Sequence, residues 1–472
     1  MKKQLFFTVY ILSFLALGFA KAQNIQFEDT TFKAALLSAS PDNKIAKDEN
    51  GNPIAIDTNG DGEISQAEAL NIYQLNIGGT QDIKSIKGIE YFANLTLLSC
   101  KDLVLEPLDL SKNINLQELD LSGAGIKTLD ISKNIKLELL RLEGNTGIKT
   151  LDISKNIYLQ TLSLSSIGIK ILDISKNINL QWLDLDDTEI KTLDISKNID
   201  LQYLDLSSTG IKILDISKNI NLQYLDLSDT GIKTLDISKN INLQYLDLSD
   251  TGIETLDVLK TINLQYLDLN GTRIKTLDVS KNIKLQYLGL SNAGVKTLDI
   301  SRNVNLQRLD LSYTGIKTLN LSKNIKLKLL NLKGNAGIKT LDISKNVDLQ
   351  RMGLSDTRIQ TLDVSKNINL QELYLEDARI KTLDVSKNIN LQYLKLNNCI
   401  GLTSLYMKNG VKKTFSFEIL KGYDLNNINL NYLCCDEDEV DAVKKYMGNR
   451  DNLTVTSDCG TESTKEISPS AN

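Results

Sequence analysis

A 21-residue unit repeats along most of this chain and constrains its fold more than any other feature. The unit is clearest at residues 222–242, which read LQYLDLSDTGIKTLDISKNIN. A fixed period of this length predicts one elongated array in which each copy contacts only its neighbours, rather than several globular domains. Only the copies at Leu137 and Leu327 contain one additional residue. The copies begin at Leu95, Leu116, Leu137, Leu159, Leu180, Leu201, Leu222, Leu243, Leu264, Leu285, Leu306, Leu327, Leu349, Leu370 and Leu391.

Each copy alternates apolar and polar residues in both of its halves. In the first half, Leu225 and Leu227 alternate with Tyr224 and Asp226, which is the two-residue period of a strand with one buried face. The second half, residues 232–238, repeats the alternation. We therefore expect two short strands per copy and two parallel sheets back to back around an apolar seam. A single copy cannot bury its own leucines, so the stacking of copies must do so.

The corners between these strands carry residues suited to turns. Gly231 gives the chain a flexible corner after the first strand. Asn240 ends the second half, and its side-chain amide is expected to bond the backbones of successive copies at the other corner.

The pattern Leu-x-x-Leu-x-Leu-x-x-Thr/Asn-x-Ile over residues 95–400 resembles the leucine-rich repeat family, in its bacterial 21-residue form called the IRREKO type. The resemblance implies a curved or weakly curved solenoid. With the two strands of each copy and the segments at the two ends, the expected fold is a β-rich solenoid of stacked parallel strands on two faces, with small helical caps. It also implies that the exposed strand face binds other molecules, usually proteins. Position nine, counted from the leading leucine, is Thr where this family usually has Asn, so we expect a weaker side-chain ladder there. These residues are Thr188, Thr209, Thr230, Thr251, Thr272, Thr314 and Thr357.

The ionisable residues exclude several classes of function. The formal net charge is -5, and residues 434–472 account for it with nine Asp and Glu against four Lys and Arg. The rest of the chain is neutral and has no basic patch for nucleic acid. Histidine is absent, which excludes the usual serine and cysteine triads. A hydrolase with paired carboxylates is the enzyme alternative, but neither loop of the repeat is long enough to form a pocket. The sequence predicts a non-catalytic binding protein.

Residues 1–22 have the form of a secretory signal peptide. Two lysines precede an apolar run over residues 5–20, and residues 20–22 give a small-x-small cleavage site before Gln23. A membrane anchor is the alternative, although the run is short and no charged flank follows it. We therefore expect a chain exported across the inner membrane to the periplasm, the exterior or the cell surface, with no membrane span.

An EF-hand-like loop occupies residues 57–68, within an N-terminal cap that we assign to residues 23–94. Oxygen donors stand at each position that such a loop uses for calcium, and Gly62 permits its sharp turn. The preceding segment reads as extended, so the motif is a loop and one helix. We expect calcium to pin this cap to the first repeats; an acidic turn without metal is the alternative. The expected ligands are Asp57, Asn59, Asp61, Glu63 through its carbonyl, Ser65 through water, and Glu68.

The rest of the N-terminal cap is predicted to contain a short helix and a degenerate repeat. Residues 27–37 suit a short amphipathic helix over the open edge of the stack, an arrangement that resembles the cap of secreted bacterial internalin-like proteins. Residues 75–94 look like a degenerate first repeat, and about 15 copies then fill residues 95–411.

A C-terminal cap is expected over residues 412–460, followed by a disordered polar tail at residues 461–472. Cys434, Cys435 and Cys459 cluster there, consistent with one disulfide formed in an oxidising compartment. The residues alone leave the pairing open.

A second resemblance bears on that pairing. The phrases around the three cysteines resemble the C-terminal cap of related Bacteroidota repeat proteins, which implies a bond between Cys434 and Cys459 and leaves Cys435 unexplained. Cys100 and Cys399 fall on inward positions of the repeat, where a small buried apolar residue is expected.

Two columns on the first strand form the candidate ligand face. Exposed aromatic residues carry much of the binding energy in protein interfaces, so we expect a protein partner here, with a glycan as the alternative. A basic segment would suit the aspartates. The competing interpretation is that identical residues stack on one another to stabilise the sheet. The columns are Trp182, Tyr203, Tyr224, Tyr245, Tyr266 and Tyr287 at position three, and Asp184, Asp205, Asp226, Asp247 and Asp268 at position five.

The second half of the repeat carries alternating columns of Lys and Asp on its outward side, such as Lys233, Asp236 and Lys239 in one copy. Opposite charges alongside one another compensate, so we interpret this face as a solvated charge lattice rather than a binding site. A structural surface-layer or matrix component is the remaining alternative function, and the sequence identifies neither the partner nor the oligomeric state.

Overall fold

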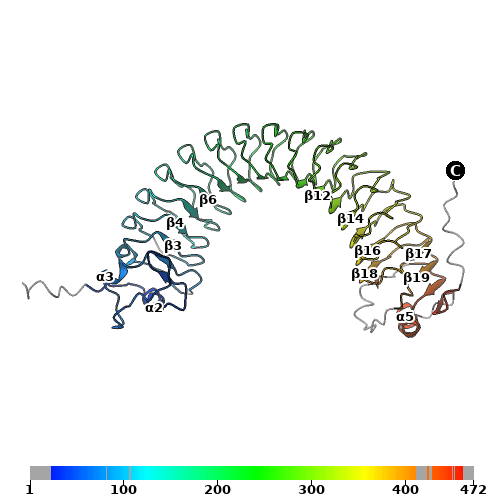
Figure 1. Cartoon of the computed structure of the whole chain (residues 1–472), viewed down its shortest axis with the longest axis horizontal. Coiled ribbons are helices and arrows are strands. Elements are labelled where there is room, and N and C mark those ends of the chain that lie inside the picture. Colours follow the sequence, from blue (N-terminus) through cyan, green and yellow to red (C-terminus); the bar gives the residue numbers. More distant parts are fainter. Residues whose placement is uncertain are drawn as a thin grey trace, which may run out of the picture. The chain divides into compact units, whose positions relative to one another are not determined.

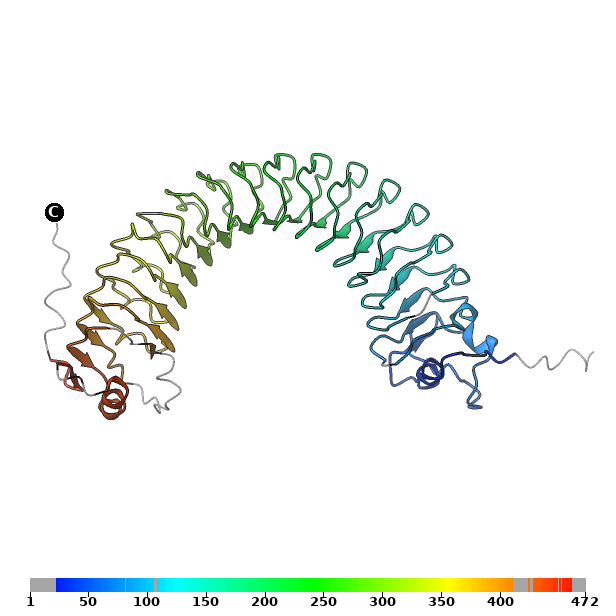
Figure 2. The same cartoon turned by 180° about the vertical axis from the view of Figure 1, so that it is seen from behind.

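The computed structural model describes residues 23–80, 82–105, 108–410, 423–424, 428–448, 450 and 452–460. The expected signal peptide and polar tail lie outside these ranges, as does the first part of the expected C-terminal cap. The chain divides into two compact units, Met1–Asn198 and Ile199–Asn472. Figures 1 and 2 show each unit, taken by itself, as a series of successive turns whose short strands line one side of that unit.

The first unit opens with a small cap. It contains helix α2 (Thr30–Leu37), strand β1 (Ala46–Lys47), helix α3 (Gln66–Ala69), strand β2 (Gln74–Asn76) and the short helix η1 (Ile89–Tyr91). Asp29 Oδ1 accepts hydrogen bonds from the amides of Thr31 and Phe32 at the start of α2. The other oxygen of Asp29 accepts from the amides of Lys84 and Ser85, so one carboxylate both caps the helix and joins it to the first turn of the array.

The strands of the first unit run parallel and in register. Strand β1 pairs antiparallel with β2, and β2 then pairs in parallel with β3, so the expected degenerate repeat begins with a strand of the sheet. The strands that follow β2 are β3 (Leu97–Ser99), β4 (Glu118–Asp120), β5 (Leu139–Arg141), β6 (Thr161–Ser163) and β7 (Trp182–Asp184).

The second unit continues the same pattern and adds a second sheet. Its long sheet consists of β8 (Tyr203–Asp205), β9 (Tyr224–Asp226), β10 (Tyr245–Asp247), β11 (Tyr266–Asp268), β12 (Tyr287–Gly289), β13 (Arg308–Asp310), β14 (Leu329–Asn331), β15 (Arg351–Gly353), β16 (Glu372–Tyr374), β18 (Tyr393–Lys395) and β20 (Tyr423–Asp424). The second sheet consists of β17 (Thr382–Asp384), β19 (Ser404–Tyr406), β21 (Tyr432–Cys434) and β22 (Thr454–Thr456).

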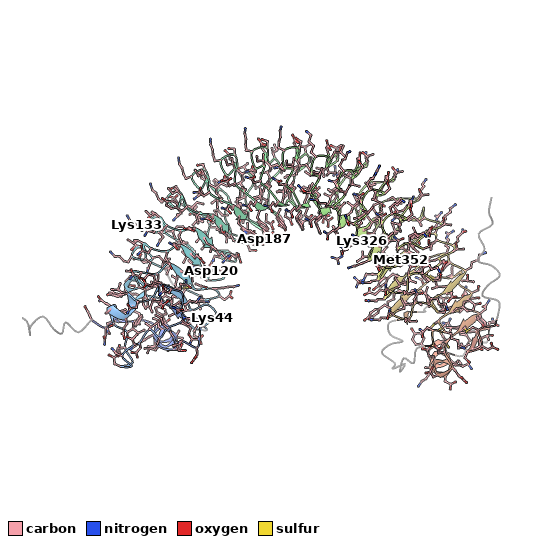
Figure 3. All side chains as sticks on the ribbon, viewed as in Figure 1. Lys44, Asp120, Lys133, Asp187, Lys326 and Met352 are labelled. Atoms are coloured by element: carbon pink, nitrogen blue, oxygen red, sulfur yellow. A yellow bond between two sulfur atoms is a disulfide. The ribbon has the colours of Figure 1, made fainter. Side chains whose placement is uncertain are left out.

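The apolar seam lies where the alternation places it. Leu222, Leu225, Leu227, Ile232 and Ile237 of one copy are almost completely buried. Figure 3 shows the polar side chains of the array directed away from this seam, with Asp120 on the strand side and Lys133 on the opposite side of the same unit. The array therefore has the stacked-strand architecture that the repeat predicts.

The second half of the repeat differs from its prediction. In the described part of the array, these segments form a hydrogen-bonded ladder only at β17 and the strands that pair after it. Local bonds replace the ladder elsewhere: Asp236 Oδ1 accepts the Ser238 amide at 2.8 Å, and the Ile237 carbonyl accepts the Asn240 amide at 3.0 Å. The inward side chains still pack, because burial requires only the alternation.

The asparagines at position 19 join successive copies as expected. Asn240 is completely buried, and its Nδ2 donates to the carbonyls of Ile216 at 3.1 Å and Asn219 at 2.8 Å, both in the preceding copy. A buried amide that makes two such bonds satisfies backbone acceptors that the solvent cannot reach.

Position nine confirms that threonine forms the weaker ladder. Thr230 Oγ1 donates only to Leu227 of its own copy, at 2.6 Å. Asn145, in one of the two 22-residue copies, instead donates to the Leu121 carbonyl of the preceding copy at 2.8 Å and accepts the Ile126 amide at 3.0 Å. The Thr230 hydroxyl bonds within its own copy, whereas an amide has both a donor and an acceptor and can bond to two groups of the preceding copy.

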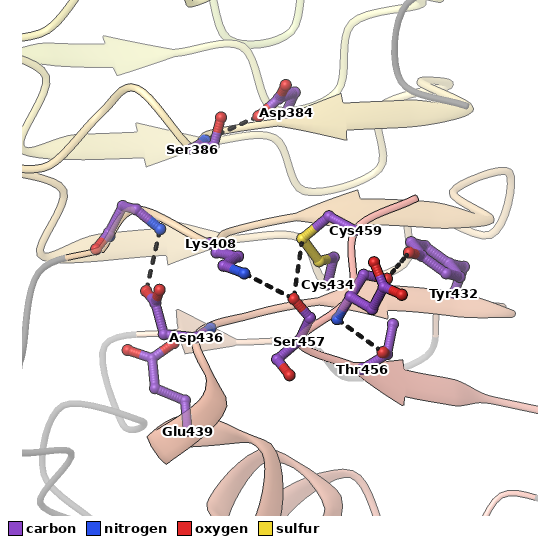
Figure 4. Close-up of a disulfide and its surroundings, with 12 residues drawn as sticks. Asp384, Ser386, Lys408, Tyr432, Cys434, Asp436, Glu439, Thr456, Ser457 and Cys459 are labelled. Carbon is purple, nitrogen blue, oxygen red and sulfur yellow. Dashed lines mark hydrogen bonds between the residues drawn. A yellow bond between two sulfur atoms is a disulfide. The ribbon is translucent and has the colours of Figure 1, made fainter. Parts of the chain in front are cut away.

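The C-terminal cap ends the second unit with η2 (Glu437–Glu439) and α5 (Val440–Met447). A disulfide joins Cys434, at the end of β21, to Cys459, with Cα atoms 5.5 Å apart (Figure 4). Lys408 Nζ donates to the Ser457 carbonyl beside it at 2.8 Å. The three free cysteines in the described ranges, Cys100, Cys399 and Cys435, are all buried.

Candidate functional site

Five consecutive strands of the second unit, β8 to β12, present a tyrosine at the same outward position. Parallel in-register pairing places each tyrosine directly beside the next one: Tyr203 beside Tyr224, Tyr224 beside Tyr245, Tyr245 beside Tyr266 and Tyr266 beside Tyr287. The central leucine of each strand points into the seam, so the tyrosines stand on the exposed side.

The tyrosine rings stack on one another in one continuous column, which we call the tyrosine ladder. All four ring pairs have centroids 4.2 Å apart and interplanar angles between 6° and 12°. Each ring covers the face of its neighbour and is half-buried, so ring edges rather than ring faces meet the solvent. The tyrosines therefore stack on one another, as the competing interpretation of the sequence expects. The ring edges are the part of the ladder that a partner could contact.

The aspartates at position five are less accessible than the sequence suggests. An open acidic stripe beside the aromatic one is wrong for Asp226, Asp247 and Asp268, because each is less than 10% exposed. Adjacent ladder residues lie over them: the Tyr224 hydroxyl donates to Asp226 Oδ2 at 3.4 Å. Asp205 is half-buried, and its Oδ1 accepts the Ser207 amide at 3.0 Å.

Burial changes the acidity of these three carboxyl groups. It raises the pKa of Asp226, Asp247 and Asp268, and the next aspartate along the array adds to the rise in each case. Hydrogen bonds to the ionised form oppose the shift: Asp226 Oδ1 accepts from the Ser228 amide at 2.9 Å and hydroxyl at 2.7 Å. Burial also raises the pKa of Tyr224, Tyr245, Tyr266 and Tyr287, so these phenols stay protonated well above neutral pH.

The last strand of the ladder differs from the others at position five. Gly289 stands in β12 where the preceding strands have aspartate, and the Tyr287 hydroxyl reaches back to Asp268 Oδ2 at 2.9 Å. A Cβ atom at Gly289 would lie 2.6 Å from Asp268 Oδ1 and 2.9 Å from the Tyr287 hydroxyl. The departure from the aspartate column was visible in the sequence, but its purpose depends on this contact.

Trp182 and Asp184, the first members of the two predicted columns, belong to strand β7 of the first unit. Trp182 is 42% exposed. Asp184 Oδ2 accepts a hydrogen bond from the Ser163 hydroxyl at 2.9 Å.

The predicted calcium loop has the backbone shape of its motif. Gly60 and Gly62 have φ of 72° and 77°, in the left-handed region that favours glycine. Asp57 accepts the amides of both glycines, at 2.7 Å and 2.9 Å. Asn59 and Asp61 each accept a hydrogen bond from the amide two residues ahead, so backbone amides of the loop bond the side-chain oxygens of the same loop.

Glu68, the last residue of the loop, is engaged by protein groups. Its Oε1 accepts from the Thr58 amide at 2.9 Å and hydroxyl at 3.0 Å, and its Oε2 accepts from the Ser65 amide and hydroxyl, both at 2.9 Å. These bonds lower the pKa of Glu68 although burial opposes them. Within the described ranges, no three His, Cys, Asp or Glu side chains converge closely enough to hold a metal ion. The oxygen-rich donor set suits calcium, whereas the carboxylates do not gather around one point.

The charge lattice on the second half of the repeat has a structural role in the turns. Asp236, Asp278 and Asp299 each accept the amide of the residue two positions on, at 2.8 to 2.9 Å. These backbone bonds are the main cause of the lowered pKa of each carboxyl group. The aspartates therefore stabilise the turns of the array.

The parallel strands, the 21-residue period and the inward leucines identify the architecture. The fold is a leucine-rich repeat solenoid. A family model described as a leucine rich repeat matches residues 239–258 of the array. No curated protein sequence matches the chain significantly.

Solved structures agree with this architecture. The functional domain of InlJ from Listeria monocytogenes, which includes a cysteine ladder, is 27% identical to this chain, with a TM-score of 0.70 over 82% of this chain and 84% of that one. A leucine-rich repeat protein of Leptospira interrogans is 25% identical, with a TM-score of 0.61 over 77% of this chain and 95% of that one. Within the described ranges, no helix has both the length and the apolar character needed to cross a bilayer.

Proposed function

We propose that this chain is a secreted, non-catalytic binding protein whose tyrosine ladder contacts a protein partner. The observation that carries the proposal is the stack of five half-buried tyrosines on the strand face. Aromatic side chains already fixed by their neighbours lose little conformational entropy on binding, and they supply large contact areas. A leucine-rich repeat solenoid supports this role because it presents one continuous strand surface to a partner.

The packing of the rings favours a protein over a glycan. A sugar stacks on an open ring face, but the inner rings Tyr224, Tyr245 and Tyr266 each have a neighbouring tyrosine on both faces. The ring edges suit the apolar and polar side chains of a protein surface instead. The aspartates beneath the rings are buried, so a basic segment of a partner has fewer exposed carboxylates to contact than an open acidic stripe would offer.

Capture of partner proteins by the wild type and by matched variants tests this function. The wild-type protein, a Tyr224→Ala/Tyr245→Ala variant and a Thr234→Ala/Thr255→Ala control on the charge-lattice face are each used to capture proteins from the native envelope or from host extracts. We expect the control to retain the wild-type partner and the tyrosine variant to lose it, with circular dichroism showing both folded. Equal capture by all three proteins would exclude the ladder as the binding surface.

We further propose that calcium stabilises the N-terminal cap through the loop at residues 57–68. The conformation of Gly60 and Gly62 and the oxygen donors of Asp57, Asn59 and Asp61 support the proposal. Calcium binding requires the Glu68 carboxylate to exchange its hydrogen bonds for the cation, which weakens the affinity of the site.

Calorimetry distinguishes calcium binding from a turn that needs no metal. Calcium titrated into the wild-type protein should release or absorb heat that Glu68→Ala abolishes. The control Glu49→Ala removes an exposed carboxylate outside the loop and should leave the heat unchanged. Absence of binding heat in the wild type would exclude the calcium site.

A further inference from the structure

A column of exposed β-branched residues follows one edge of the second unit, away from the tyrosine ladder. These residues occupy position 20 of their copies, or position 21 for Val347 in a 22-residue copy. Each follows a buried asparagine, or the buried Thr261 in one copy, and precedes the buried leucine that opens the next copy. We call this column the isoleucine ridge. Its members, each 43% to 53% exposed, are Ile199, Ile220, Ile241, Ile262, Ile283, Val304, Ile325, Val347, Ile368 and Ile389.

The backbone of the ridge already has internal partners. Asn242, Asn263 and Asn305 each donate from Nδ2 to the carbonyl of the ridge residue one copy earlier, at 3.2, 3.1 and 2.9 Å. The glutamines that follow also bond one another, as Gln244 Nε2 does with Gln223 Oε1 at 3.3 Å. Because the asparagine and glutamine side chains beside the ridge already bond to carbonyl groups of neighbouring copies, the ridge offers a partner mainly apolar side-chain contacts.

The ridge is large for an exposed apolar surface. Ten half-exposed isoleucines and valines present on the order of 800 Å², about the area that each partner buries in a stable protein complex. The largest apolar patch of a typical monomer is about 300 to 600 Å². The ridge is therefore of the right size to be an interface.

The spacing of the ridge indicates what covers it. Each member lies one copy from the next, in turns that precede strands stacked at a spacing of about 4.8 Å. A matching surface must present apolar side chains at that spacing over many copies, and the ridge of a second molecule does so by construction. We propose that the isoleucine ridge is a homotypic interface that joins two copies of this chain and leaves both tyrosine ladders accessible.

The side chains of the ridge favour a second copy over a lipid surface. Lysines occupy positions 12 and 18, as Lys233 and Lys239 do, against one column of aspartates at position 15, such as Asp236, so the charge near the ridge does not by itself argue against anionic lipid. The ridge, however, consists of Ile and Val and lacks the Trp, Phe or Leu side chains that an interfacial helix inserts into a bilayer. Two ladders on one dimer would also bind a multivalent partner with higher avidity than one.

Sedimentation velocity of the purified protein from about 1 to 100 µM tests the interface. We expect the wild type to dimerise and an Ile220→Lys/Ile241→Lys/Ile283→Lys variant to dimerise at least tenfold more weakly. The control Thr234→Lys/Thr255→Lys/Thr297→Lys adds the same charge at exposed positions of the charge-lattice face and should dimerise like the wild type. Circular dichroism must show all three folded; if the lysine variant unfolds, Ile→Thr at the same positions keeps the β-branch and replaces it.

Further results would overturn or separate the proposals. A wild type that stays monomeric over this range, or a ridge variant that dimerises normally, overturns the interface. Ridge-dependent flotation of a monomeric wild type with phosphatidylglycerol vesicles would assign the ridge to a lipid surface instead. The Tyr224→Ala/Tyr245→Ala variant should remain dimeric, so failure of the ladder as a binding site is distinguishable from failure of the ridge.

Discussion

Strands β8 to β12 and strands β13 to β16 of the second unit share one backbone, one register and one buried leucine seam, yet their exposed faces differ. The first group carries identical tyrosines, which stack at 4.2 Å and bury the aspartates beside them. The second group carries mixed residues: Arg351 forms an ion pair of 2.6 Å with Glu372, and the Tyr374 hydroxyl donates to the same carboxylate at 2.7 Å. In-register stacking places each residue beside its equivalent, so the chemistry of a face depends on whether those equivalents are identical or complementary.

The largest expected effect checks that the two regions share one core. Leu246→Ala under the ladder and Leu330→Ala under β14 each remove a completely buried side chain, and each should lower the free energy of unfolding by about 2 to 5 kcal/mol. Urea unfolding followed by circular dichroism measures both. Unequal losses would show that the exposed faces alter the packing beneath them.

Removing one ring should separate the regions clearly. Tyr245→Ala deletes two ring stacks, each worth about 0.5 to 1.5 kcal/mol beyond its buried area, whereas Leu329→Ala at the equivalent position of β14 deletes none. The tyrosine variant should therefore be less stable than the leucine variant in urea. If the two variants unfold together, stacking does not stabilise the ladder.

The buried aspartates should make the ladder region respond to acid. Burial holds the pKa of Asp226, Asp247 and Asp268 above the ordinary value of 3.8, so the folded state retains protons that the unfolded chain has released. Their contribution to stability therefore increases as pH falls through the folded pKa values, and stops changing below 3.8.

A variant with all three of these aspartates changed to asparagine should lose that response, measured by urea midpoints between neutral pH and 3.8. The charge-lattice aspartates, such as Asp236 and Asp278, have a lowered pKa and act in the opposite sense: their contribution is present above 3.8 and is lost as pH falls below it. A pH response that survives in the triple variant would assign it to other groups.

The smallest expected effect concerns the ion pair of the second group. Glu372→Gln removes the partner of the half-exposed Arg351 and should cost about 1 kcal/mol or less, with the difference shrinking at high salt. Tyr245→Ala should show little salt dependence by comparison. Equal salt dependence in both variants would remove the distinction between a stacked face and a charged one.

The strand, its buried face and the asparagine bonds of each repeat can be predicted from the sequence, because apolar residues must face the seam and buried amides must bond to backbone groups. The alternation at Leu225 and Leu227 predicts the strand and its buried face, and the amide of Asn240 predicts bonds to the preceding copy. The isoleucine ridge had a signal as well: its residues stand between two inward positions, Asn240 and Leu243, so that Ile241 must face outward.

The sequence alone determined the period, the register and the inward set, because these depend on local alternation and on identical copies stacking. Only the tertiary structure decided which outward residues are accessible. The sequence predicts an exposed Asp268, but this residue is buried, and the Tyr287 hydroxyl of the next strand donates to it. Gly289 likewise acquires its role only when the Tyr287 hydroxyl turns back to Asp268. Accessibility depends on the volume of side chains one copy away, and that arrangement exists only after the strands have paired.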